Sequence, residues 1–472
     1  MNLCGKNIFS RSTCCLTQFK SFSHSNGSSA LHFKLTNLLE NYALSDGDAR
    51  EKLKVSASRR GCEVNINYLV DIATKFSLNS VTSEDELINM YKNLSKLPNA
   101  TCPIAEELSG PKIIGLFGTK RVLDDALMLE QLSHHGVDMN MTGNFTGSRS
   151  YYLRGSMAHL ESKLTQYALE HLKRKGFKLM SVPDLVTEDI LESCGVPVHG
   201  ERTMVYSVSP SHLGLPSPSK EESKKVCLSG TSEMALGGWL RNHSFTEEQL
   251  PLKLCAVSRC YRAETSKLKL EQGIFRVHHF TKVEMFGITS NETGQESDDL
   301  YQELVQIQIE LLQGLGLHGQ VVLMPPEELG NPAYSKTDLE VWLPGRRRYA
   351  ELTSASNCTS YQAARLGASY VNKKGQRKLV HTVNGTAVAV PRCIIALCET
   401  HQEATGRRAL QLPAFLGLAP AHPQQFQPNE TSVDTGHEHN AFLNKVMVYN
   451  EQCLRKVLPL KNYEDLIDSD EN

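Results

Sequence analysis

The 472-residue chain lacks three features that would each indicate a particular class of protein. Its 50 lysines and arginines almost balance 52 aspartates and glutamates, so any nucleic-acid partner must be held by a local patch and not by overall charge. Its 13 cysteines show no paired C-x-x-C spacing, which argues against a zinc ribbon and favours reduced, mostly buried thiols. No apolar run approaches the roughly 20 residues of a membrane span, so no membrane partner is expected. The length favours two or three domains.

Acidic side chains are absent from the first 39 residues. Lys6, Arg11 and Lys20 stand there among serines and threonines, and the apolar residues are interrupted by polar ones. This composition is typical of a mitochondrial transit peptide and not of a secretory signal. We therefore expect residues 1–25 to direct the chain to the mitochondrial matrix, with a disordered tail as the alternative.

Two short amphipathic helices are predicted between residues 66 and 97. Ile66, Leu69 and Ala73 have helical spacing, and a second apolar set follows Ser83, a residue suited to cap a helix. Each helix has room for about 12 to 14 residues, or roughly 20 Å. Lysines and acidic residues offset each other here, so the segment lacks the net positive surface that favours binding to an RNA backbone.

A charged pair of strands is predicted within residues 254–289. Leu254–Val257 is apolar and Phe275–Ile288 alternates, so two antiparallel strands joined by a polar loop are expected. Arg262 and Arg276 lie on or beside these strands. Two guanidinium groups on one face suit a polyanion such as a triphosphate. A salt-bridged sheet surface is the alternative interpretation of the same residues.

The wording of this stretch, CYRAET followed by GIFRVHHFTKVEMFG, resembles motif 2 of class II aminoacyl-tRNA synthetases. It is most similar to the seryl-tRNA synthetases, and to their mitochondrial branch in particular. The resemblance covers roughly residues 97–418. Within that range, a predicted helix (157–175) and strand (177–185) resemble motif 1, ELTSASNC (351–358) resembles E-x-x-S-x-S-N-C, and HTVNGTAVAVPRCIIALCET (381–400) resembles motif 3.

This resemblance implies an α+β fold, a class II antiparallel sheet flanked by helices and preceded by a shortened helical-hairpin arm. The expected domains are an N-terminal region with the reduced arm (26–100), a catalytic-type domain (101–418), and a linker with a tail helix (419–472). Motif 1 builds the dimer interface in this family, so we expect a homodimer, or a heterodimer with a related synthetase. The implied substrates are serine, ATP and tRNA(Ser), with Mg²⁺ as the metal.

CLSGTSEMAL (227–236) looks like the family's T-x-E loop for the amino acid. On a strand, Thr231 and Glu233 would point to one side and suit an amino group with a small polar side chain. The remaining roles follow from the family's motifs. The serine-binding residues are expected to be Thr231, Glu233, Arg262, Glu284, Asn384 and Thr386. The ATP-binding residues are expected to be Arg262, Glu264, Arg276, Val277, Phe280, Glu351, Ser354 and Arg392, of which Arg262 and Arg392 are catalytic and Glu351 and Ser354 hold Mg²⁺.

These features predict a mitochondrial serine–tRNA ligase that forms seryl-adenylate and transfers serine to the 3′ end of tRNA(Ser). Three features depart from the family. The arm is short, Ser360 stands where the family has an acid, and Ala364 stands where the family has an arginine. A second hypothesis is therefore a catalytically silent synthetase-like mitochondrial protein, of the kind insects carry, that binds tRNA or a synthetase partner without charging. A third is a stand-alone serine-activating or carrier-protein ligase. The paired phosphate arginines favour an active site.

Overall fold

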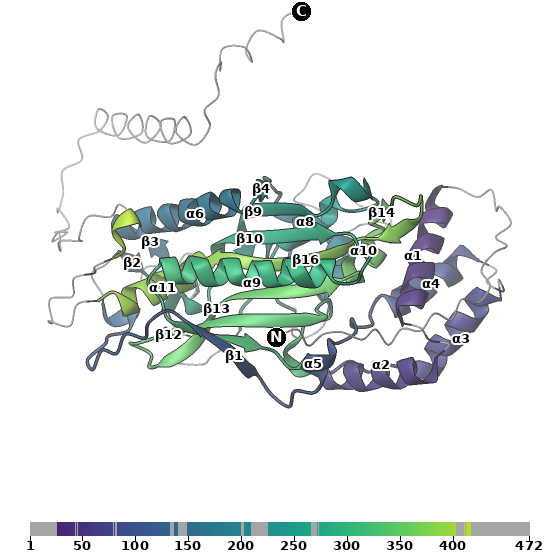
Figure 1. Cartoon of the computed structure of the whole chain (residues 1–472), viewed down its shortest axis with the longest axis horizontal. Coiled ribbons are helices and arrows are strands. Elements are labelled where there is room, and N and C mark those ends of the chain that lie inside the picture. The colour runs from purple at the N-terminus through teal and green to yellow at the C-terminus, as the bar shows by residue number, and fades with distance from the viewer. Residues whose placement is uncertain are drawn as a thin grey trace, which may run out of the picture. The chain divides into compact units, whose positions relative to one another are not determined.

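An eight-stranded sheet forms the centre of the fold (Figure 1). Its neighbouring strands are antiparallel except for the edge pair β4 and β9, which is parallel. This arrangement confirms the predicted fold class. In spatial order the strands are β1 (Lys112–Phe117), β11 (Gly319–Leu323), β12 (Ser335–Leu343), β13 (Arg348–Thr359), β16 (His381–Ala389), β10 (His279–Thr289), β9 (Leu252–Tyr261) and β4 (Lys178–Leu179).

The computed structural model describes residues 26–416 except 43, 45, 79, 81–82, 133–135, 140–148, 200–202, 209–224, 266–270, 272, 403–409 and 411. The predicted transit peptide, most of the loop after Arg262, and the predicted linker and tail helix lie outside the described residues. Among the helices that are described, none combines the length and the apolar character needed to cross a membrane.

The two faces of the sheet bury different sets of helices, because successive side chains of a strand point to opposite sides. On β10, Val283 and Met285 join a core formed with α6 (Ser156–Arg174), α9 (Glu296–Gly314) and α11 (Val390–Thr400). Phe286 and Ile288 face the other way. They join a second core with α7 (Glu188–Ser193), α8 (Ser232–Trp239) and α10 (Tyr361–Leu366).

Smaller sheets and one further short α-helix also lie in the described part of residues 101–416. One three-stranded sheet joins β5, β7 and β6, another joins β15, β14 and β8, and β2 pairs with β3. Their bounds are β2 (Val137–Asp138), β3 (Tyr152–Leu153), β5 (Leu185–Thr187), β6 (Tyr206–Val208), β7 (Val226–Leu228), β8 (Ser244–Thr246), β14 (Ser369–Val371) and β15 (Arg377–Leu379), and the helix is α5 (Pro103–Glu106).

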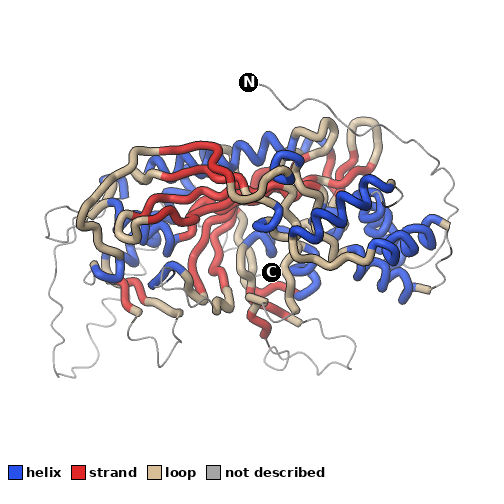
Figure 2. The backbone as a smooth tube through the Cα atoms, turned by 90° about the horizontal axis from the view of Figure 1, so that it is seen from below, coloured by secondary structure: helices blue, strands red, loops and turns tan. Residues whose placement is uncertain are grey.

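Four helices, gathered at one end of the sheet, form the N-terminal region (Figures 1 and 2). They are α1 (Asn26–Tyr42), α2 (Gly47–Arg59), α3 (Ile66–Ser77) and α4 (Glu84–Leu94). The two predicted helices, α3 and α4, are confirmed, and the Ser83 hydroxyl caps α4 by accepting from the Glu86 N–H at 3.2 Å. The predicted simple hairpin is replaced by a four-helix cluster, because Leu35 and Leu38 of α1 share one core with Leu94 and with Ala364 of α10.

Two strand predictions require correction. The second motif 2 strand begins at His279, not at Phe275, because Gly273–Phe275 forms a 3₁₀ turn. Gly273 has φ +70°, and a Cβ there would lie 1.7 Å from the Glu130 carboxylate, so the chain turns where an extended strand was expected. The predicted strand 177–185 is broken into β4 and β5, which belong to different sheets. Pro183 lies between them and has no N–H to give to a sheet.

Candidate functional site

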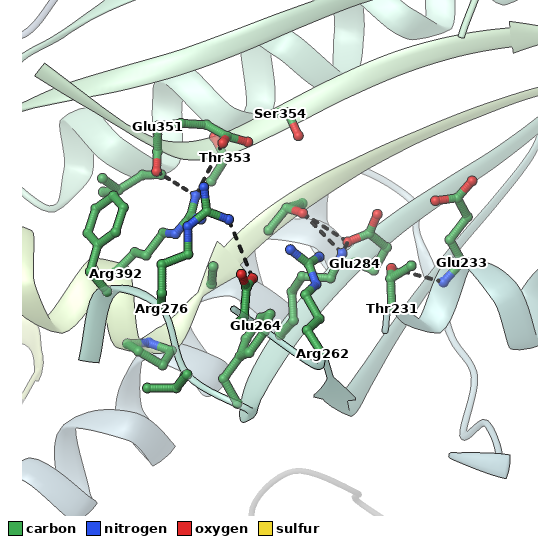
Figure 3. A pocket seen from close by; sticks show the side chains of 18 of the residues that line it. Thr231, Glu233, Arg262, Glu264, Arg276, Glu284, Glu351, Thr353, Ser354 and Arg392 are labelled. Carbon is green, nitrogen blue, oxygen red and sulfur yellow. Dashed lines mark hydrogen bonds and ion pairs between the residues drawn. The ribbon is translucent and has the colours of Figure 1, made fainter. Parts of the chain in front are cut away.

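A cavity opens beside the central strands (Figure 3). Side chains from β10, β13 and β16, from the segment after β9, and from the first turns of α8 and α11 line it. The structure brings all of the predicted site residues together around this cavity. They are Thr231, Glu233, Arg262, Glu264, Arg276, Val277, Phe280, Glu284, Glu351, Ser354, Asn384, Thr386 and Arg392.

A buried three-residue network occupies one end of the cavity, which we call the amino-acid end after the residues predicted to bind serine. Lys282 Nζ lies 2.5 Å from Glu284 Oε2, and these side chains are only 6% and 3% exposed. The Thr386 hydroxyl donates to Glu284 at 3.0 Å and accepts from Lys282 Nζ at 3.2 Å. Lys282 was not among the predicted site residues. Its position two residues before Glu284 on one strand placed both side chains on one face, and that signal could have identified it.

Thr231 and Glu233 also lie at the amino-acid end, but not on a strand as predicted. Thr231 is the N-cap of α8, and its hydroxyl accepts the Glu233 N–H at 3.3 Å. Threonine is a favoured cap, and a carboxylate in the first turn is favourable beside the positive end of a helix. Burial, followed by the charge of Glu284, raises the pKa of Glu233 to about 7.

Three arginines line the rest of the cavity, which we call the nucleotide end after the residues predicted to bind ATP. Arg276 and Arg392 lie together beside Glu351, and Arg262 lies between them and Glu284 (Figure 3). Arg276 lies 3.4 Å from Glu264, and Arg392 donates to the carbonyl and carboxylate of Glu351 at 2.8 and 3.3 Å. Arg262 donates to the Gly230 carbonyl at 3.3 Å, and its guanidinium lies 5.2 Å from the centre of the Phe280 ring. Two of these guanidinium groups therefore pair with carboxylates that an anionic ligand could replace.

A β-bulge turns Glu351 and Ser354 toward the same cavity. On β13, Glu351 pairs with Glu340 of β12 while Thr353 pairs with Leu339, so Leu352 is an additional residue on one strand. Residues three apart on a regular strand point to opposite sides of the sheet. The extra residue of a bulge between Glu351 and Ser354 brings both side chains to the same side. Burial alone would raise the pKa of Glu351, but the nearby charges of Arg392, Lys336 and Arg262 lower it to about 2. The carboxylate is therefore ionised at neutral pH.

Gln308 of α9 supports the cavity from the opposite face of the sheet. The pairing of β13 with β16 ends at Ala355 and Gly385, so the carbonyls of Ser354 and Thr386 lie beyond the paired part of the two strands. The Gln308 amide, fully buried, donates to both carbonyls at 2.8 Å. Sequence reasoning missed this residue. It could have been identified as the one amide side chain among the leucines on the buried side of an amphipathic helix.

Comparisons with known proteins agree with this geometry. Residues 213–401 match the model of the tRNA synthetase class II core domain (G, H, P, S and T). Over 367 residues the chain is 38% identical to the mitochondrial serine–tRNA ligase of Mus musculus, a match that covers 72% of this chain and 66% of the mouse protein. Over 337 residues it is 36% identical to the serine–tRNA ligase of Treponema denticola, covering 69% and 75% of the two chains.

A solved structure also resembles this fold. It is the seryl-tRNA synthetase of Pyrococcus horikoshii complexed with ATP, with a TM-score of 0.63 and 26% sequence identity. The match covers 83% of this chain and 91% of the other.

Proposed function

The chain belongs to the serine–tRNA ligase family, and we propose that it carries out a two-step reaction in mitochondria. It would form seryl-adenylate from serine and ATP and then transfer serine to the 3′ end of tRNA(Ser). The observation that carries this proposal is the division of one cavity into two ends. A buried acid–hydroxyl network lies at one end, and arginines suited to phosphates lie at the other.

At the nucleotide end, Arg262 would contact the α-phosphate, and Arg276 and Arg392 the β- and γ-phosphates. The attacking group would be the serine carboxylate, which is already anionic at pH 7 and needs no general base. Its oxygen bonds to the α-phosphorus while the bond to the β-phosphate's bridging oxygen breaks, and pyrophosphate leaves. Catalysis then consists mainly of positioning the two substrates and stabilising negative charge on the phosphoryl group. Fixed guanidinium groups around a partly buried cavity suit both tasks.

At the amino-acid end, Glu233 and Thr231 would hold the serine ammonium group, and Glu284 with Thr386 would bind its hydroxyl. Lys282 neutralises Glu284, so that this carboxylate stays buried without an uncompensated charge. An analogue without the hydroxyl, such as alanine, would cover these polar groups without offering them a hydrogen bond. We therefore expect strong rejection of alanine.

Mg²⁺ would be held by Glu351 and Ser354. A carboxylate and a hydroxyl offer the hard oxygen ligands that this ion prefers, and the bulge at Leu352 turns both toward the cavity. The donor set therefore fits the ion. Bound there with the nucleotide, the ion would supply positive charge to the phosphate oxygens.

The buried charges favour a working site over the silent alternative. Lys282 and Glu284 are almost completely buried, and buried ion pairs are often replaceable by apolar residues without loss of stability. An idle cavity therefore has no physical need for them.

We also propose a matrix location and a dimer, formed with a second copy or with a related synthetase. The mitochondrial name of the mouse relative supports the first. Exposed apolar side chains on the two edge strands support the second. Leu179 of β4 is 63% exposed, and Ile113 and Leu116 of β1 are 56% and 68% exposed.

Serine-dependent exchange of pyrophosphate into ATP tests the proposal on the purified full chain. We expect robust exchange from the wild type. Arg262→Ala should lower the exchange rate at least about 100-fold, because removing one preorganised hydrogen-bond donor from a developing negative charge costs that much in rate. Arg241→Ala is the matched control, since Arg241 pairs with Asp189 and does not line the cavity. Exchange that is absent from the folded wild type would contradict the ligase proposal and favour a protein kept for binding.

A further inference from the structure

Helix α10 lies between the N-terminal helices and the amino-acid end of the cavity. All six of its residues are buried. Ala363 and Leu366 belong to the core on the cavity side of the sheet, whereas Ala364 belongs to the core of the N-terminal helices. The two cores therefore meet at one short helix, where the small side chain of Ala364 packs against the N-terminal helices.

The N-terminal helices hold α10 through Arg365, which is 1% exposed. Its guanidinium donates to the carbonyls of Ser95 and Leu97 at 3.0 and 2.9 Å and to the Tyr42 hydroxyl at 3.0 Å. In return, the Tyr91 hydroxyl donates to the Arg365 carbonyl at 3.1 Å. Both the side chain and the backbone of this residue are therefore fixed by the N-terminal region.

On the side of the cavity, α10 presents Gln362. Its amide nitrogen donates to the Glu233 carboxylate at 2.6 Å, and its amide oxygen accepts from the Thr382 hydroxyl at 2.8 Å. An ionised carboxylate can only accept, so the amide nitrogen faces Glu233 and the amide oxygen is left to accept from Thr382. Gln362 and Arg365 lie one helical turn apart, so a shift of α10 would move both contacts together.

We propose that α10 couples the N-terminal helices to the amino-acid end of the cavity, with Gln362 as the positioning residue for the Glu233 carboxylate. This inference rests on the proposed function, because it takes Glu233 to bind the ammonium group of serine. The N-terminal helices, which do not form a long arm, would thus help to position the amino-acid site of their own subunit. Releasing their hydrogen bonds to Arg365 should weaken the binding of serine more than the binding of ATP.

A second contact between the same regions provides an internal control. Arg59 of α2 donates to Glu327 at 2.7 Å and to the carbonyls of Glu106 and Leu108. None of these residues lines the cavity or contacts α10 in the hydrogen bonds of the described residues. Breaking this contact loosens the N-terminal region without disturbing the route from Arg365 to Glu233.

The experiment measures KM for serine and for ATP separately in pyrophosphate exchange by the full chain. Gln362→Met removes the hydrogen bond to Glu233 at nearly constant volume, and we expect KM for serine to rise about tenfold or more while KM for ATP stays within twofold. Tyr42→Phe combined with Tyr91→Phe removes two hydroxyls that hold Arg365, and should raise KM for serine about threefold to tenfold. Arg59→Gln should leave both constants unchanged.

Equal increases in both KM values, or an Arg59→Gln variant that behaves like the tyrosine pair, would overturn the coupling and indicate general loosening. Thermal unfolding of each variant shows whether it is folded at the assay temperature. A wild type without exchange would contradict the proposed function, and calorimetric titration with serine would then test the coupling alone. Serine binding that is weakened by Gln362→Met supports the coupling, and serine binding that is unchanged or absent overturns it.

Discussion

The two ends of the cavity use charge in different ways. At the amino-acid end, Lys282 and Glu284 are almost inaccessible and are bonded to each other and to Thr386. At the nucleotide end, Arg276 and Glu351 are 28% and 36% exposed, their partners Glu264 and Arg392 are 7% and 14% exposed, and both ion pairs are longer. The groups of the first end are fixed by their bonds to one another, whereas the second has contacts that phosphates can replace. Selectivity for a small amino acid needs fixed groups, and binding of a polyanion needs exchangeable ones.

The largest expected effect is on stability, from breaking the buried pair at the amino-acid end. Lys282→Met leaves Glu284 buried without a counter-charge and should lower the free energy of unfolding by about 3–5 kcal/mol. Denaturant unfolding checks this value. The double variant Lys282→Met with Glu284→Gln should recover much of the loss, because no isolated charge remains. A loss below about 1 kcal/mol in the single variant would show that the pair is not tightly buried.

The next effect is on catalysis, at the nucleotide end. Arg392→Ala should lower the rate of exchange about 100-fold to 1000-fold, because a positioned donor to the phosphates is lost, while the free energy of unfolding changes little. Arg392→Lys keeps the positive charge but loses the paired N–H donors of the guanidinium group, so it should recover only part of the activity. A variant that lost serine affinity instead of exchange rate would contradict the division of the cavity.

Local patterns in the sequence predicted what local physics determines. The alternation around Val283 predicted the central hairpin, and Ser83 predicted the start of α4. The same spacing rule applied to Leu31, Leu35 and Leu38 would have found α1, which was missed. The candidate residues came from motif resemblance, and the structure gathers them around one cavity.

Contacts between residues far apart in the chain could not be predicted in this way. Gln362 and Glu233 are separated by 129 positions and Gln308 and Thr386 by 78, and no periodicity links such pairs. Thr231 shows a different limit, because a strand and a capped helix compete for the same few residues. In the structure Thr231 caps α8, and α8 packs on the sheet.

A smaller effect on stability is expected at Gln308, which bridges β13 and β16 between the two ends of the cavity. Gln308→Leu removes the donor from two backbone carbonyls and should cost about 1–3 kcal/mol of unfolding free energy. Gln306→Leu, on the exposed side of the same helix, should change stability by less than about 0.5 kcal/mol. If both variants behave alike in denaturant unfolding, the bridge between β13 and β16 contributes nothing.

The smallest effect is the pH dependence of the amino-acid end. Glu233 has a raised pKa of about 7 and pairs with an ammonium group only when ionised, so kcat/KM for serine should rise as pH increases through about 7 and then level off. The Gln362 hydrogen bond favours the ionised form and lowers the pKa of Glu233. Gln362→Met should therefore move the inflection to higher pH, and Arg59→Gln should not. An inflection that is the same in all three proteins would mean that another group titrates, and Glu233 would then bind serine without Gln362 influencing its charge.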